Sequence, residues 1–101
     1  MKKKYEIQYL EIAKNDLDQI FEYILKDNPS SAIEILNEID DAVSKLTVFP
    51  ELGTQPKDDK LKAFGYRILV INNYLVFYII KEKFVEIHRV LHSNRDYNNL
   101  L

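Results

Sequence analysis

The strongest constraint on the fold is the apolar run from Ile68 to Ile80, which is interrupted only by Asn72-Asn73. Two strands joined by two such residues are typical of a β-hairpin, because asparagine tolerates the positive φ that a tight turn requires. A third apolar segment follows at 84–92 after a short polar break. The pattern therefore predicts a three-stranded antiparallel meander over 65–71, 74–81 and 84–92.

The first half of the chain predicts one strand and two helices. Residues 3–9 alternate well enough for a strand, and apolar residues then recur at helical spacing over 10–25 and 32–46. Asn28 suits the N-cap of the second helix, and Pro29 suits its first position. On the first helix, the side expected to face solvent carries charged residues: Lys14, Asp16, Asp18, Glu22 and Lys26.

The second helix is expected to stop at Phe49-Pro50, because the residue before a proline avoids the helical conformation. Residues 50–63 then form the only long irregular segment. The order of elements predicts an α+β fold: an N-terminal strand, an antiparallel helix hairpin and a three-stranded antiparallel meander, with the helices on one face of a single sheet. Residues 1–101 are expected to form one domain.

Both faces of the predicted meander are apolar over 66–80. Two helices cover only one face, and a large apolar area left open on a soluble protein indicates a partner. The alternative is that segment 50–63 or the C-terminal tail folds over the second face. The pattern leaves both possibilities open.

Composition limits the class of protein further. The chain is 47% hydrophobic and 30% charged, which is typical of a soluble globular domain, and it has no cysteine. No apolar run approaches the roughly 20 residues that span a membrane. The three lysines after Met1 are followed by Tyr5-Glu6 rather than by the apolar core of a signal peptide, so a cytoplasmic location is expected. The net charge of −2 does not indicate a strong polyanion binder.

Several motifs, in order, resemble the RelE/ParE superfamily of bacterial type II toxin–antitoxin toxins. The first helix is similar to that family's A-x-x-D-L-x-x-I-x-x-Y-I pattern over Ala13–Ile24, and 49–53 reads F-P-E-L-G. Gly65-Tyr66-Arg67 with 73–78 resembles the segment G-x-R followed by Y-x-V-x-Y, and 89–97 resembles the ending R-V-L-H-x-x-R-D. Each motif alone is loose, but the series covers nearly the whole chain.

The resemblance implies a growth-inhibiting toxin that is neutralised by a small cognate antitoxin, whose flexible segment lies across the toxin's sheet and helices. RelE-like members cleave mRNA on the ribosome, whereas ParE-like members poison DNA gyrase and have no recognised hydrolytic site. Fold alone does not separate the two branches. A homodimer or a toxin–antitoxin hetero-oligomer is compatible with either, and no cofactor is expected.

If the chain is a nuclease, metal-free RNA cleavage needs an acid, a base and cations near the developing charge. Four residues are the candidates for these catalytic roles: Arg67, His92, Arg95 and Tyr97. Each has a structural alternative. These are an ion pair for Arg67, a hydrogen bond to the backbone for His92, a solvated place in the tail for Arg95 and a packed ring for Tyr97. His88 is expected to have no catalytic role. The candidates for contact with a target or antitoxin are Arg67, Arg89, Arg95, Tyr74 and Tyr78, with a structural role as the alternative for Arg89.

One departure from the nuclease pattern favours the ParE-like branch. The ribonuclease members usually carry an arginine in the strand that corresponds to 74–78, and this chain has none there. Lys57, Lys60 and Lys62 lie before the second strand of the meander, but two aspartates lie among them, and the whole chain is net acidic. The alternatives are a ribosome-dependent endoribonuclease and an inactive module that only binds antitoxin. A metal site is not expected, because His88 and His92 on one strand lie about 13 Å apart.

Overall fold

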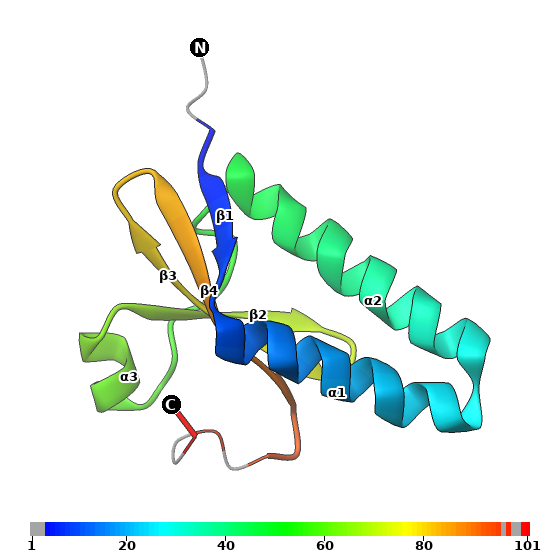
Figure 1. Ribbon diagram of the computed structural model, residues 1–101. Helices are drawn as coiled ribbons and strands as arrows, with labels where there is room; N and C mark the ends of the chain where they lie inside the picture. Colours follow the sequence, from blue (N-terminus) through cyan, green and yellow to red (C-terminus); the bar gives the residue numbers. More distant parts are fainter. Residues whose placement is uncertain (1–3, 96, 98–99) are drawn as a thin grey trace.

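The computed structural model describes residues 4–95, 97 and 100–101. Its elements are β1 (Glu6–Tyr9), α1 (Glu11–Asp27), α2 (Pro29–Ser44), the short 3-10 helix η1 (Lys45–Thr47), α3 (Asp59–Ala63), β2 (Tyr66–Ile71), β3 (Tyr74–Lys81) and β4 (Phe84–His92). The four strands form one sheet in the order β1-β4-β3-β2, in which β1 and β4 are parallel and the other pairs antiparallel. Figure 1 shows the α1–α2 hairpin beside this sheet. The predicted α+β fold is confirmed.

The predicted helix boundary and hairpin turn are also confirmed. The Asn28 side chain accepts a hydrogen bond from the backbone N–H of Ser31, and Pro29 begins α2. Asn72 adopts φ 53°, the left-handed conformation expected between β2 and β3. None of the helices in the described part of the chain has the length and hydrophobicity needed to cross a lipid bilayer.

The larger core lies between the helix hairpin and one face of the sheet. Its fully buried members come from α1, α2, η1, β3 and β4: Ala13, Ile39, Val43, Leu46, Val76, Tyr78, Val85, Ile87 and Val90. Ile7 and Tyr9 of β1, and Tyr5 just before it, pack against this core. At about 25 cal/mol per Å² of apolar surface, this layer is the main source of stability.

The second face of the sheet is covered in part by the end of the chain. Ile68, Phe77 and Leu91 are buried there, and the partly buried residues that pack on them include Tyr97, Leu100 and Leu101. The Tyr97 ring lies 5.0 Å from the Phe77 ring, measured between centroids. The sequence left open whether a partner or the chain itself covers this face. In its central part, the C-terminal tail covers it. Val70 on the edge strand β2 remains 65% exposed.

Segment 50–63 is more ordered than the sequence predicted. It contains α3, which begins where the Asp58 side chain accepts a hydrogen bond from the N–H of Leu61. Before that helix, Thr54 exchanges two backbone hydrogen bonds with Ile68 and extends the sheet by one bridge. The prediction of a wholly irregular segment is therefore wrong, because local capping and strand pairing satisfy its backbone groups.

Candidate functional site

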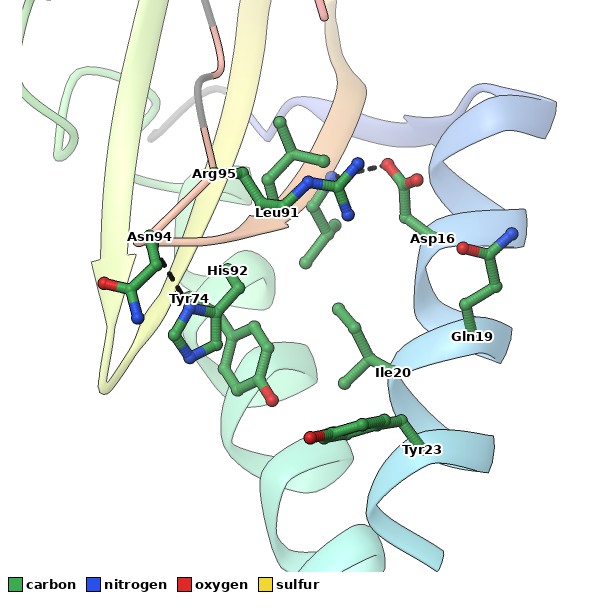
Figure 2. Close-up of a pocket in the computed structure, with 10 residues that line it drawn as sticks. Asp16, Gln19, Ile20, Tyr23, Tyr74, Leu91, His92, Asn94 and Arg95 are labelled. Atoms are coloured by element: carbon green, nitrogen blue, oxygen red, sulfur yellow. Dashed lines mark hydrogen bonds between the residues drawn. The ribbon is translucent and has the colours of Figure 1, made fainter.

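The candidate site is a pocket of about 610 Å³ where α1 faces the adjoining ends of β3 and β4. Figure 2 shows side chains converging on it from both sides. It is lined by Asp16, Gln19, Ile20 and Tyr23 from α1, Tyr74 from β3, Val90, Leu91 and His92 from β4, and Asn94 and Arg95 after β4. We call it the α1–β4 pocket.

Asp16 anchors α1 to the sheet at the base of this pocket. Its carboxylate accepts hydrogen bonds from Arg89 Nε (2.8 Å) and Nη2 (2.9 Å), and a third from the backbone N–H of Val90 (3.0 Å). The pair is mostly buried, and the bond to Asp16 raises the pKa of Arg89. Such charge-assisted, bidentate pairs combine strength with a defined geometry.

The place of Asp16 follows from the end of β1. That strand stops at Tyr9, which lies opposite Ile87 on β4, so on this side of β4 no strand of the described residues lies beyond Ile87. The Asp16 carboxylate supplies the acceptor for Val90 that a longer β1 would have offered. A buried N–H without a partner is costly, and the carboxylate removes that cost.

The sequence prediction for Asp16 itself was wrong. It was placed with the charged residues on the outer side of α1, but it is only 8% exposed. Its position three residues after buried Ala13 and four before Ile20 puts it on the inner face. The spacing to Ala13 and Ile20 already predicted a buried position. The prediction failed because Asp16 was grouped with the other charged residues by its residue type.

An aromatic wall on the strand side of the pocket is formed by Tyr74 and His92. The two rings meet edge to face with centroids 5.4 Å apart. His92 Nδ1 accepts a hydrogen bond from the N–H of Asn94 at 3.1 Å, which assigns the ring proton of the neutral imidazole to Nε2. Burial, with a smaller contribution from Tyr23, raises the pKa of Tyr74, so this phenol stays neutral.

The outer rim of the pocket is exposed and suits contact with another macromolecule. Tyr23 is 72% exposed, and Gln19 and Arg95 are also exposed. Tyrosine and arginine are enriched at protein interfaces, where aromatic residues and arginine contribute most of the binding energy. Sequence reasoning missed Gln19 and Tyr23 as site residues, although Tyr23 was part of the helix motif.

The pocket brings together three of the predicted site residues: Tyr74, His92 and Arg95. Arg67 lies elsewhere, where its Nη1 donates hydrogen bonds to the backbone carbonyls of Gly53 (2.8 Å) and Glu51 (3.3 Å). The structural alternative expected for Arg67 was an ion pair. Its guanidinium instead donates hydrogen bonds to backbone oxygens.

Tyr97 and Arg89 both have structural contacts. Tyr97 packs on Phe77, on the sheet face opposite the helix hairpin. Arg89 binds Asp16 and donates a further hydrogen bond from Nη1 to the carbonyl of Leu100 at 2.9 Å. For Arg89, these bonds are the structural alternative that the sequence left open.

Tyr78 is not accessible to a partner in this structure, contrary to its place among the predicted contact residues. Its side chain is fully buried, and its hydroxyl donates to the Pro50 carbonyl (2.7 Å) and accepts from the Gly53 N–H (2.8 Å). A Cβ on Gly53 would lie 2.7 Å from that hydroxyl, so glycine is required there. Tyr78 therefore fastens the segment after α2 to the sheet.

A second polar cluster joins β2 and β4. His88 Nδ1 lies 3.1 Å from the Tyr66 hydroxyl, and its Nε2 lies 3.2 Å from Glu86 Oε1. The bond to His88 lowers the pKa of Glu86, whereas burial raises the pKa of Tyr66. His88 and His92 thus have separate surroundings.

The fold defines a class: a small α+β domain with a helix hairpin on one face of a four-stranded sheet, an architecture found in toxin–antitoxin structures. A chromosomal ParDE TA system from P. aeruginosa aligns with a TM-score of 0.76 and 19% identity, over 92% of this chain and 100% of that chain. The toxin–antitoxin complex RelBE2 from Mycobacterium tuberculosis aligns with a TM-score of 0.62 and 20% identity, over 88% and 98%. At these identities the likeness establishes the fold.

The family follows from the sequence comparison. Residues 7–97 match the model of the ParE toxin of type II toxin-antitoxin systems, parDE. The chain therefore belongs to the ParE toxin family, which confirms the resemblance read from its motifs. No curated protein matches the chain significantly.

Proposed function

We propose that this chain is a growth-inhibiting toxin that acts on DNA gyrase without hydrolysing nucleic acid, and that a cognate antitoxin neutralises it. Membership of the ParE family supports the toxin role. The choice of gyrase rests on one observation: the four candidate residues for metal-free cleavage do not all lie at one site, because His92 and Arg95 share a pocket from which Arg67 and Tyr97 are absent.

The separation of these residues follows from the strand register. Arg67 pairs with Tyr78, whereas His92 pairs with Tyr74, four residues earlier in β3. That is about 13 Å along the strand direction. The Arg67 guanidinium is also held by backbone carbonyls at 51 and 53.

Tyr97 is separated from His92 in another way, because it packs on the opposite face of the sheet from the helix hairpin. Acid–base catalysis needs its groups within hydrogen-bond reach of the reacting atoms, and positioning alone accounts for several orders of magnitude in rate. The arrangement thus favours binding over cleavage.

The α1–β4 pocket is the surface we assign to gyrase contact. Arg95 and Tyr23 are its exposed cationic and aromatic groups, and His92 with Tyr74 forms a firm wall behind them. Interfaces depend on a few such groups surrounded by less important contacts.

The proposal is tested with purified protein, gyrase and supercoiled plasmid. We expect inhibited supercoiling or trapped, cleaved DNA complexes. Arg95→Ala with Tyr23→Ala should weaken the effect by at least about tenfold, which is about 1.4 kcal/mol and less than a single interface hot spot contributes. Lys62→Ala with Phe64→Ala, which removes an exposed cation and an exposed ring elsewhere, is the matched control. Full supercoiling activity at saturating toxin would contradict the proposal.

A ribosome-dependent endoribonuclease is the second candidate, and the Tyr66–His88–Glu86 cluster is the observation that favours it. A histidine between a phenol and a carboxylate has the form of an oriented acid–base group. Cleavage of mRNA on translating ribosomes, abolished by His88→Gln with retained folding, would establish this function instead. Normal growth on expression of the folded protein without antitoxin would indicate an inactive, antitoxin-binding module.

A further inference from the structure

The turn that follows β4 is organised by one residue, His92. The backbone N–H of Asn94 donates to His92 Nδ1 at 3.1 Å, and that of Arg95 donates to the His92 carbonyl at 3.0 Å. The N–H of Ser93 donates to the carbonyl of Asn73 in the adjacent turn at 2.8 Å. Two of these three acceptors belong to His92. We call residues 92–95 the His92 turn, because its conformation depends on these bonds.

The His92 ring is supported from the side by Tyr74. Figure 2 shows the two rings together, with the bond from Asn94 on the His92 ring. Their centroids are 5.4 Å apart in an edge-to-face arrangement, and Tyr74 is buried. Aromatic pairs of this geometry are attractive and oriented. The direction in which Nδ1 points is therefore set by packing, before any partner binds.

The His92 turn carries Arg95 to the rim of the α1–β4 pocket. Arg95 is exposed, and within the described ranges its guanidinium forms no ion pair. A side chain on a loose loop must lose conformational freedom when it binds, whereas a turn that is already ordered has lost part of that freedom beforehand. The affinity that Arg95 contributes to a contact thus depends on the order of the turn.

The bond from Asn94 requires a neutral imidazole. Both ring nitrogens of a protonated histidine carry hydrogen, so neither accepts a hydrogen bond. Histidine is the side chain that commonly gains its proton between about pH 5 and pH 8. A proton on His92 would set the Asn94 N–H against a second N–H. It would also place a positive charge three residues from Arg95, in the same turn.

The charged and titratable groups around His92 come from several elements. Those that line the pocket with it are Tyr74 from β3, Asp16 and Tyr23 from α1, and Arg95 from the turn. Asp16 is paired with Arg89, and Glu38 on α2 accepts a hydrogen bond from Asn72 in the turn beside Asn73. The unpaired charge in these surroundings is that of Arg95, and it opposes a proton on His92.

We propose that His92 is a positioning residue of the gyrase contact. Its neutral Nδ1 holds the turn in the conformation that presents Arg95, and protonation of the ring releases this conformation. The identity of the partner rests on the proposed function. The control of the turn rests on the hydrogen bonds of His92 alone.

The turn is tested on the purified protein by nuclear magnetic resonance between about pH 8 and pH 5. We expect the Asn94 amide signal to shift with the same midpoint as the His92 ring signals. In His92→Asn, the side-chain oxygen accepts from the N–H two residues on and does not titrate, so the Asn94 signal should stay constant. Ser93→Ala keeps all three bonds and should follow the wild type. An Asn94 amide that ignores the ring titration would overturn the proposal.

Binding to gyrase at about pH 8 separates positioning from direct contact. His92→Phe keeps a ring beside Tyr74 but has no acceptor, and it should bind at least about threefold more weakly, the effect of one net hydrogen bond. His92→Asn should bind within about twofold of the wild type, because it restores the acceptor. Equal losses in both variants would mean that His92 contacts gyrase itself, and the proposal would fail.

Two further measurements test whether His92 acts through Arg95 and through its proton. In the Arg95→Ala background, His92→Phe should cause no additional loss of binding, whereas an additive loss would contradict the proposal. At about pH 6 the wild type should bind at least about threefold more weakly than His92→Asn. Comparing the two proteins at each pH removes the pH dependence of gyrase. A constant ratio would contradict control by the proton.

Failure of the proposed function gives a different result. If the wild type stops growth without binding gyrase, the target is wrong, and growth inhibition should still rank the wild type and His92→Asn above His92→Phe. Equal inhibition by all three would overturn the role of His92. If the protein is inert in both assays but the Asn94 amide follows the ring, the toxin activity is wrong and the control of the turn stands.

Discussion

The carboxylate of Asp16 on α1 accepts two hydrogen bonds, of 2.8 and 2.9 Å, from the guanidinium of Arg89 on β4. It accepts a third from the backbone N–H of Val90. One side chain thus sets the distance between the helix hairpin and the sheet. It also forms the base of the α1–β4 pocket. The geometry of the proposed gyrase contact depends on this pair.

Asp16→Asn should destabilise the fold strongly. It leaves the mostly buried Arg89 charge without its counter-charge, and breaking one side of such a pair costs about 3–5 kcal/mol. The free energy of unfolding in urea measures the effect. Asp18→Asn, two positions along on the exposed side, should change it by less than about 0.5 kcal/mol. Similar losses from both variants would show that the pair does not hold α1.

Tyr78→Phe should loosen the segment after α2. The change removes the hydroxyl that pairs the buried Gly53 N–H and the Pro50 carbonyl, and an unpaired buried group costs about 1–3 kcal/mol. Amide hydrogen exchange at residues 51–55 should accelerate along with the loss of stability. Tyr23→Phe removes an exposed hydroxyl and serves as the control. Unchanged exchange would contradict the role of the Tyr78 hydroxyl.

Tyr97→Ala should uncover part of the second sheet face. The ring packs against Phe77, and loss of a half-buried aromatic contact is expected to cost roughly 1–3 kcal/mol. Binding of a dye that reports apolar surface should rise with it. Tyr23→Ala, at the exposed rim of the α1–β4 pocket, should leave stability nearly unchanged. If the Tyr97 variant keeps wild-type stability and dye binding, the tail does not protect this face.

Alkaline pH should destabilise the protein in part through Tyr9. Its folded-state pKa of about 12 lies above the ordinary value of 10.0, so its contribution to stability is fully present below pH 10.0 and is lost as the pH rises toward about 12. Tyr9→Phe cannot ionise and should lose less stability over that interval. Urea unfolding of both proteins across the interval measures the difference, with Tyr23→Phe as the control. Parallel losses in all three proteins would refute the contribution of Tyr9.

The sequence predicted most of the fold because local rules and hydrophobic pattern agree in this chain. Asn28 and Pro29 define the start of α2, and Asn72 defines the tight turn between β2 and β3. These features depend on neighbouring residues only, which is why a single sequence reveals them.

The candidate site was less predictable because it depends on contacts between distant segments. His92 and Arg95 share a pocket with α1 residues, whereas Arg67 is drawn away by the backbone carbonyls of segment 51–53. Neither outcome is contained in strand periodicity. The buried position of Asp16, in contrast, was available from its spacing to Ala13 and Ile20.

The parallel pairing of β1 with β4 has a consequence for the order of folding. It places Ile7 beside Val85, so almost the whole chain must be gathered before this edge can close. The helix hairpin and the β2–β3–β4 meander are local units that form without long loop closure. The pairing of β1 with β4, in contrast, carries the entropic cost of closing a loop of almost the whole chain. We therefore expect β1 to detach first under stress, and hydrogen exchange at residues 6–9 should report the earliest opening of the sheet.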